Sequence, residues 1–129
     1  MKRSIVAKTP GSAFGDIEPN LHHAAFQDDV DFMFYCLDKG QTFQDRRGAN
    51  GLTPVHIAVI YKSYRFLEEA IKTRQMNPWV RDCNLRLPID IAQAFKDRIS
   101  MKMLYDWMYE GPFGPRPDAE VMEFPNQGL

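Results

Sequence analysis

The chain has 129 residues, of which 44% are hydrophobic and 12% aromatic, and its formal net charge is −1 at pH 7. This composition is typical of one globular domain, and it excludes a wholly disordered chain and a globally basic binder of nucleic acid or membranes. Two cysteines are too few for a disulfide framework. No apolar run reaches the roughly 18 residues of a membrane span.

The first 18 residues are expected to form an N-terminal extension that caps the rest of the domain. Their basic start, Met1 to Arg3, is not followed by the apolar stretch of a secretory signal peptide. We therefore expect a cytoplasmic protein, with a translocated or secreted effector as the alternative. The side chains expected to cover the first helix are Ile5, Val6, Phe14 and Ile17.

Three segments of similar pattern follow, and each is predicted to fold as two helices separated by a polar break. The first helix of each pair begins at a short block around His22, His56 or Asp90. The second helices are predicted at Val30 to Leu37, Tyr64 to Ile71 and Ile99 to about Tyr109. The polar breaks are Asp28-Asp29, Lys62-Ser63 and Lys96-Asp97, and Gly40 is a candidate helix C-cap.

The three blocks are a repeat with a period of 34 residues. A branched aliphatic residue and an alanine recur at fixed positions in each block, and Thr-Pro opens the middle helix. The aligned segments are Asn20-Leu21-His22-His23-Ala24-Ala25, Thr53-Pro54-Val55-His56-Ile57-Ala58 and Leu87-Pro88-Ile89-Asp90-Ile91-Ala92. A period of this length indicates stacked supersecondary units, because one unit cannot bury its apolar face alone.

The block Thr53 to Ala58 resembles the ankyrin motif T-P-L-H-x-A, with Val55 in place of leucine. The outer repeats depart from the motif: the first lacks Thr-Pro, and the third has Asp90 for histidine and Leu85 for the turn glycine. The resemblance implies an all-α fold, an ankyrin-repeat solenoid of helix-turn-helix units joined by turn or β-hairpin-like linkers. The expected repeats span about 19–50, 51–84 and 85–110.

The same resemblance implies a partner-binding surface on the turn tips and on the ends of the first helices. Aromatic side chains would line the helix ends, where solvent-facing residues are usually polar, and such patches are typical of binding hot spots. An alternative is that the register is shifted and these residues belong to the core. The helix-end positions are Phe26, Gln27, Ile60, Tyr61, Ala94 and Phe95, and the tip positions are Arg47, Ala49, Asn50, Leu52, Arg81, Cys83, Asn84 and Arg86.

The sequence indicates no catalytic centre, metal site or cofactor. His22 and His56 fill one structural position in successive repeats, so a metal cluster with Asp28 or Asp29 is the less favoured interpretation. Cys36 is expected in the core and Cys83 at an exposed turn. We find no phosphate-binding loop, paired-acid motif or nucleophile elbow, and therefore predict that the protein is not an enzyme.

Residues 111–129 are predicted to form a Pro/Gly-rich C-terminal tail that either folds over the last helix or binds a partner. Its start, Gly111 to Pro117, cannot continue a helix. Apolar residues follow, and the preceding helix is apolar on almost all sides. The tail has a net negative charge, because Arg116 is outnumbered by Asp118, Glu120 and Glu123.

The leading functional hypothesis is a non-catalytic inhibitor or adaptor that blocks, sequesters or recruits one protein, such as an enzyme or a transcription regulator. Phe26, Tyr61 and Phe95 would anchor this partner, and arginines at the tips would steer it. Nucleic-acid binding along the basic tips is an alternative, against which the near-zero charge of the repeats argues. A structural or oligomerising role is another, and we expect a monomer or weak homodimer that does not bind membranes.

Overall fold

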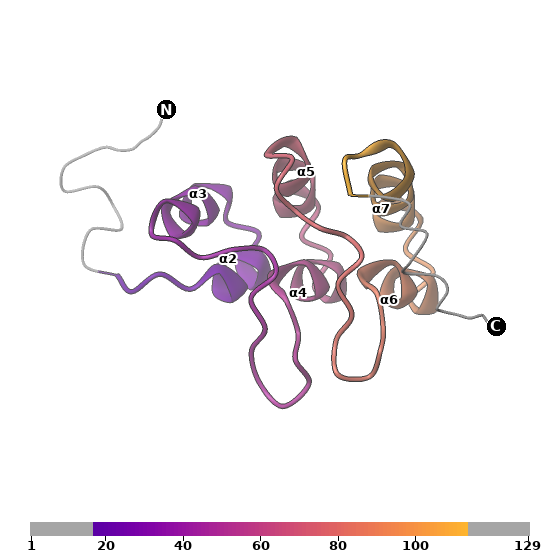
Figure 1. The fold of residues 1–129 in the computed structure, drawn as a ribbon, viewed down its shortest axis with the longest axis horizontal. Coiled ribbons are helices and arrows are strands. Elements are labelled where there is room, and N and C mark those ends of the chain that lie inside the picture. The colour runs from indigo at the N-terminus through magenta and orange to yellow at the C-terminus, as the bar shows by residue number, and fades with distance from the viewer. Residues whose placement is uncertain (1–16, 114–129) are drawn as a thin grey trace.

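The computed structural model describes residues 17–113, so most of the two proposed extensions lies outside the described residues. Within this range the chain forms six helices and no strand. Figure 1 shows them as three pairs, with α2, α4 and α6 in one row and α3, α5 and α7 in a second row. The bounds are α2 (Leu21–Gln27), α3 (Val30–Asp38), α4 (Pro54–Ile60), α5 (Tyr64–Lys72), α6 (Pro88–Ala94) and α7 (Arg98–Glu110). This all-helical arrangement is compatible with an ankyrin-like helical repeat.

Two long loops connect the pairs and project on the same side of the helices (Figure 1). The first, between α3 and α4, narrows where Arg47 and Leu52 exchange backbone hydrogen bonds of 3.0 and 3.2 Å. The second, between α5 and α6, closes through a 3.0 Å bond from the Asp82 N–H to the Arg86 carbonyl. The tips of both loops therefore hold a defined shape.

Side chains at the helix starts satisfy N–H groups that have no partner inside the helix. Thr53 caps α4, and Pro54 follows it in the first turn, where a missing N–H costs nothing. Asp97 caps α7 by accepting the Ser100 N–H. In α6, Asp90 accepts the Leu87 N–H at 2.8 Å, so this aspartate takes over part of the role of the expected histidine.

Left-handed backbone conformations recur with the same 34-residue period as the sequence motif. Each polar break begins with such a residue, which lets the chain reverse between the two helices of a pair. The corresponding positions are Asp28, Lys62 and Lys96; Gly40 and Arg74; and Gly51 and Leu85. Equivalent residues in different pairs thus share a backbone conformation even where their side chains differ.

Small side chains let the first helices approach each other closely, because Ala24, Ala58 and Ala92 are completely buried. Large residues fill the space between the two helix rows. Phe43, in the loop after α3, packs edge-on against Phe66 with ring centroids 6.0 Å apart. None of the helices in the described part of the chain is both long enough and apolar enough to cross a lipid bilayer.

Candidate partner-binding surface

Three exposed aromatic rings lie at the carboxyl ends of α2, α4 and α6. The exposed fractions of Phe26, Tyr61 and Phe95 are 48%, 53% and 50%. Phe26 and Tyr61 touch edge to face, with centroids 4.6 Å apart. The alternative that a shifted register buries these residues therefore does not hold for the three rings.

The neighbouring residues at these helix ends are less uniform than the aromatic rings. Ile60 is half-buried and packs against the core, whereas Gln27 and Ala94 are exposed. His23 adds a ring to the first helix end, since it stacks on Phe26 at 5.9 Å. The apolar surface is thus concentrated on Phe26 and Tyr61, with Phe95 one repeat further along.

The two loop tips are joined to each other. The Asn50 carbonyl accepts the Cys83 N–H at 2.8 Å, and the Arg46 guanidinium donates to the Arg81 carbonyl at 2.8 Å. Of the tip positions named from the sequence, Leu52 is half-buried, and the exposed ones are Arg47, Ala49, Asn50, Arg81, Cys83, Asn84 and Arg86. Arg46 forms no ion pair within residues 17–113, because its guanidinium bonds a neutral carbonyl.

Asp82 organises the second tip, a role that the sequence analysis did not identify. Its buried carboxylate accepts the N–H groups of Asn84 and Arg86, each at 2.9 Å, and pairs with the Arg86 guanidinium at 2.8 Å. Burial alone would raise the pKa of Asp82, but these hydrogen bonds and the Arg86 charge lower it overall. An aspartate in a predicted turn is a signal for such a loop, because its carboxylate can accept the backbone N–H two residues later.

Both histidines of the repeated block connect their helix to the next loop. His22 Nε2 lies 2.9 Å from the Leu52 carbonyl, and His56 Nε2 lies 2.9 Å from the Arg86 carbonyl. His56 Nδ1 also contacts the Thr53 hydroxyl at 2.8 Å. Burial lowers the pKa of both imidazoles. Within residues 17–113 no three His, Cys, Asp or Glu side chains converge as metal ligands would.

The cysteines lie in different environments, as the sequence suggested. Cys36 is buried in the core, and burial raises the pKa of its thiol to about 11. Cys83 is exposed on the second tip. A thiol with a raised pKa is a poor nucleophile, so Cys36 acts as a packing residue.

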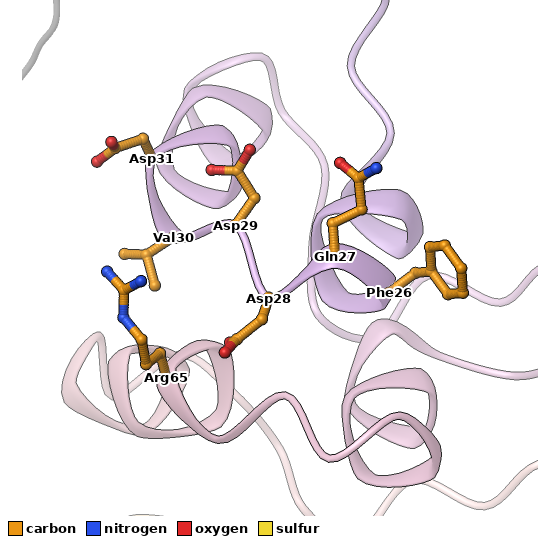
Figure 2. Close-up of a pocket in the computed structure, with 7 residues that line it drawn as sticks. All are labelled: Phe26, Gln27, Asp28, Asp29, Val30, Asp31 and Arg65. Carbon is orange, nitrogen blue, oxygen red and sulfur yellow. The ribbon is translucent and has the colours of Figure 1, made fainter.

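A shallow hollow lies where the polar break after α2 meets the start of α5 (Figure 2). Asp28 and Asp29 line it, but their carboxylates accept the N–H groups of Phe66 and Phe32 at 2.7 and 3.0 Å. Arg65 extends along its rim, and Phe26 points away from it in Figure 2. These aspartates cap the starts of α5 and α3.

Comparison with known proteins gives one informative relative. The chain is 31% identical over 74 residues to the I-Kappa-B like protein H1 of Microplitis demolitor bracovirus. The match covers 57% of this chain and 38% of the viral protein, so the chain spans well under half of its relative's length. No family model matches the sequence. Since I-kappa-B-like proteins are an ankyrin-repeat family, the match agrees with the motif at Thr53 to Ala58.

Proposed function

We propose that this chain is a small ankyrin-repeat protein without catalytic activity that binds one protein partner and blocks or sequesters it. The three helix pairs would be three repeats, at about 19–50, 51–84 and 85–110. The 34-residue recurrence of left-handed residues supports this interpretation. The similarity to a protein named I-kappa-B-like supports a regulatory partner, such as a transcription regulator or an enzyme.

The exposed Phe26–Tyr61 pair is the observation that carries the proposal. Its two rings are in contact and about half-exposed, so they are already ordered before a partner arrives. Pre-ordered aromatic rings lose little conformational entropy on binding and are enriched among binding hot spots. Phe95 extends this anchor surface by one repeat.

The loop tips would supply charge beside the aromatic anchors. Arg86 is neutralised by Asp82, whereas Arg46, Arg47 and Arg81 form no ion pair among the described residues. Three uncompensated guanidinium groups attract an acidic partner and increase its association rate. We therefore propose that the partner presents an apolar segment flanked by acidic residues.

Affinity capture from a lysate of the native host tests this function. The wild-type chain is compared with a Phe26→Ser, Tyr61→Ser, Phe95→Ser variant, and captured proteins are quantified by mass spectrometry. Phe34→Ser is a matched control, because Phe34 is 44% exposed but lies on α3. We expect one partner that the control retains and the triple variant loses. Equal capture by all three chains would contradict the assignment of the aromatic surface.

The unpaired arginines also favour a second candidate, nucleic-acid binding along the tips. That function predicts an affinity that falls steeply with salt and needs no aromatic surface. A salt titration with duplex DNA and single-stranded RNA distinguishes the two candidates. If the chain is a protein inhibitor, we expect no measurable nucleic-acid affinity at physiological salt. If it binds nucleic acid along the tips, we expect the triple serine variant to bind as tightly as the wild type.

A further inference from the structure

Neighbouring helix pairs are joined by polar contacts that show which residues of each pair face the next one. Asp28, after α2, accepts the Phe66 N–H of α5 at 2.7 Å. Tyr64 of α5 donates its hydroxyl to Asp97, the cap of α7, at 3.0 Å. Both contacts run from an earlier pair to the following pair. Their positions therefore mark the side of a pair that faces the C-terminal end of the stack.

A groove between α5 and α7 marks three more positions of this kind. Its wall on α5 is formed by Glu68, Ile71 and Lys72, which face Trp107 of α7. In α7, the last helix, the equivalent positions one period of 34 residues later have no following helix to face within the described chain. The positions equivalent to Glu68 and Ile71 lie on the open end of the stack, whereas the residue equivalent to Lys72, Asp106, lines the groove beside α5.

The residues at these equivalent positions make the open end basic and partly aromatic. Asp28 corresponds to Lys96, Tyr64 to Arg98, and the three groove residues to Lys102, Tyr105 and Asp106. Lys102 pairs with Asp106 at 3.0 Å. Lys96 and Arg98 are exposed and form no ion pair within residues 17–113, and Tyr105 is 58% exposed. A cationic surface with an exposed ring is suited to an acidic, apolar peptide.

The chain itself contains such a peptide shortly after the last described residue. The sequence Glu120-Val121-Met122-Glu123-Phe124 alternates carboxylates with apolar side chains, and Asp118 precedes it. The described chain ends at Phe113, whose ring contacts Trp107 of α7 with centroids 6.3 Å apart. The tail therefore starts from the surface of the last helix pair.

The tail is long enough to reach the basic surface. Glu120 is seven positions after Phe113, and this length of chain spans up to about 25 Å when extended. The distance along α7 from its last residue back to Arg98 is about 18 Å at the rise of an α-helix. A short tether also gives a local concentration on the order of millimolar, which exceeds that of any second copy in dilute solution.

We propose that residues 120–124 bind in cis to the open end of the stack, with Glu120 and Glu123 facing Arg98 and Lys102 and with Phe124 against Tyr105. The tail thereby covers the surface that a fourth repeat would cover. Terminal units of repeat proteins need such a cover with a polar outer face. This proposal concerns a different surface from the aromatic anchors and does not depend on the partner.

A charge-reversal cycle in the full chain tests the contact. Glu120→Lys with Glu123→Lys, or Arg98→Glu with Lys102→Glu, is expected to lower the melting temperature by about 4 °C or more. Combining the two pairs of substitutions is expected to restore most of this loss. Lys39→Glu with Lys62→Glu is the control, because these exposed cations lie away from the open end. If the two decreases in melting temperature simply add in the combined variant, the proposal is overturned.

Zero-length carbodiimide cross-linking at micromolar protein concentration gives an independent readout. We expect amide bonds between Lys96 or Lys102 and Glu120 or Glu123, found in the monomer fraction by mass spectrometry. The Glu120→Lys, Glu123→Lys variant is expected to lose these bonds. Their appearance in a dimer fraction only, which would indicate a second copy on this surface, or their absence from both fractions would overturn the proposal.

Discussion

Gly51 and Leu85 lie one repeat period apart and adopt nearly the same backbone conformation, with φ of 63° and 64°. Glycine takes this left-handed conformation without strain, whereas leucine does not. The sequence pattern had marked Leu85 as a departure from the turn glycine of the ankyrin motif. The structure shows that the departure changes the side chain and leaves the turn unchanged.

Leu85→Gly is therefore expected to stabilise the protein. The side chain is 71% exposed, so little packing is lost, and relief of the left-handed conformation is worth about 1 kcal/mol, less the entropy that glycine adds to the unfolded chain. Chemical denaturation followed by circular dichroism measures the change in the free energy of unfolding. A clear destabilisation would show that the leucine side chain contributes packing that outweighs its strain.

Gly51→Ala is expected to have the opposite effect. A Cβ at position 51 would lie 2.6 Å from the sulfur of Cys83, in addition to the strain at positive φ. We expect a loss of about 1–2 kcal/mol in the free energy of unfolding, since the tips must separate to accept the methyl group. Gly48→Ala serves as a comparison, because its Cβ would meet no atom within 4 Å. Equal losses at the two glycines would contradict the role of the Cys83 contact.

His56→Leu is expected to destabilise the fold by about 2–3 kcal/mol, because it removes the bonds of a buried imidazole to the Arg86 carbonyl and the Thr53 hydroxyl. The exposed His23 provides the control, and His23→Leu should change the free energy of unfolding by less than about 0.5 kcal/mol. Equilibrium unfolding in urea measures both values. Similar small effects at the two positions would show that the link from α4 to the next loop is dispensable.

The stability of the chain should fall as the pH drops below about 6.5, the ordinary pKa of histidine. Burial lowers the pKa of His22 and His56 in the folded state, so the unfolded chain takes up protons that the folded chain does not. Stability is therefore full above this pH and declines from there towards pH 5. Near His56 the charged groups are Asp82, Arg86 and Arg46, and Asp82 stays ionised in this range because its pKa is lowered.

Melting temperatures measured between pH 5 and pH 8 test this dependence. The change of melting temperature with pH is expected to be smaller in a His56→Asn variant, which has no imidazole to protonate at this site. A flat profile in the wild-type chain would contradict the inferred effect of burial.

Much of this architecture follows from local sequence signals. The helix pairs, the caps at Thr53 and Asp97 and the reversal at Asp28 depend on residues close together in the chain. The link from His56 to the next loop was also foreseeable, because the repeat brings each first helix against the following turn. These features need only periodicity and the chemistry of helix ends.

Other features depend on contacts between residues that are distant in the sequence. Phe43 lies in a loop, yet it is buried because Phe66, from the next pair, packs against it. The Ser63 hydroxyl donates to the Ala25 carbonyl, and the Trp107 indole donates to the Met76 carbonyl. No periodic pattern marks these partners, since each contact occurs at one repeat boundary only. The role of Asp82 is local and was overlooked, since its carboxylate bonds residues only two and four positions later.

The central claim is that the aromatic rings at the helix ends anchor a protein. The affinity of the purified partner for variants of these rings tests it most directly. Isothermal titration calorimetry compares the wild type with Phe26→Ser, Tyr61→Ser and the Phe34→Ser control. Hot-spot residues contribute about 2 kcal/mol or more, so we expect each of the first two variants to weaken binding about 30-fold or more. We expect the control to bind within about twofold of the wild type. Unchanged affinity in the Phe26 and Tyr61 variants, or an equal loss in the Phe34 control, would contradict the claim.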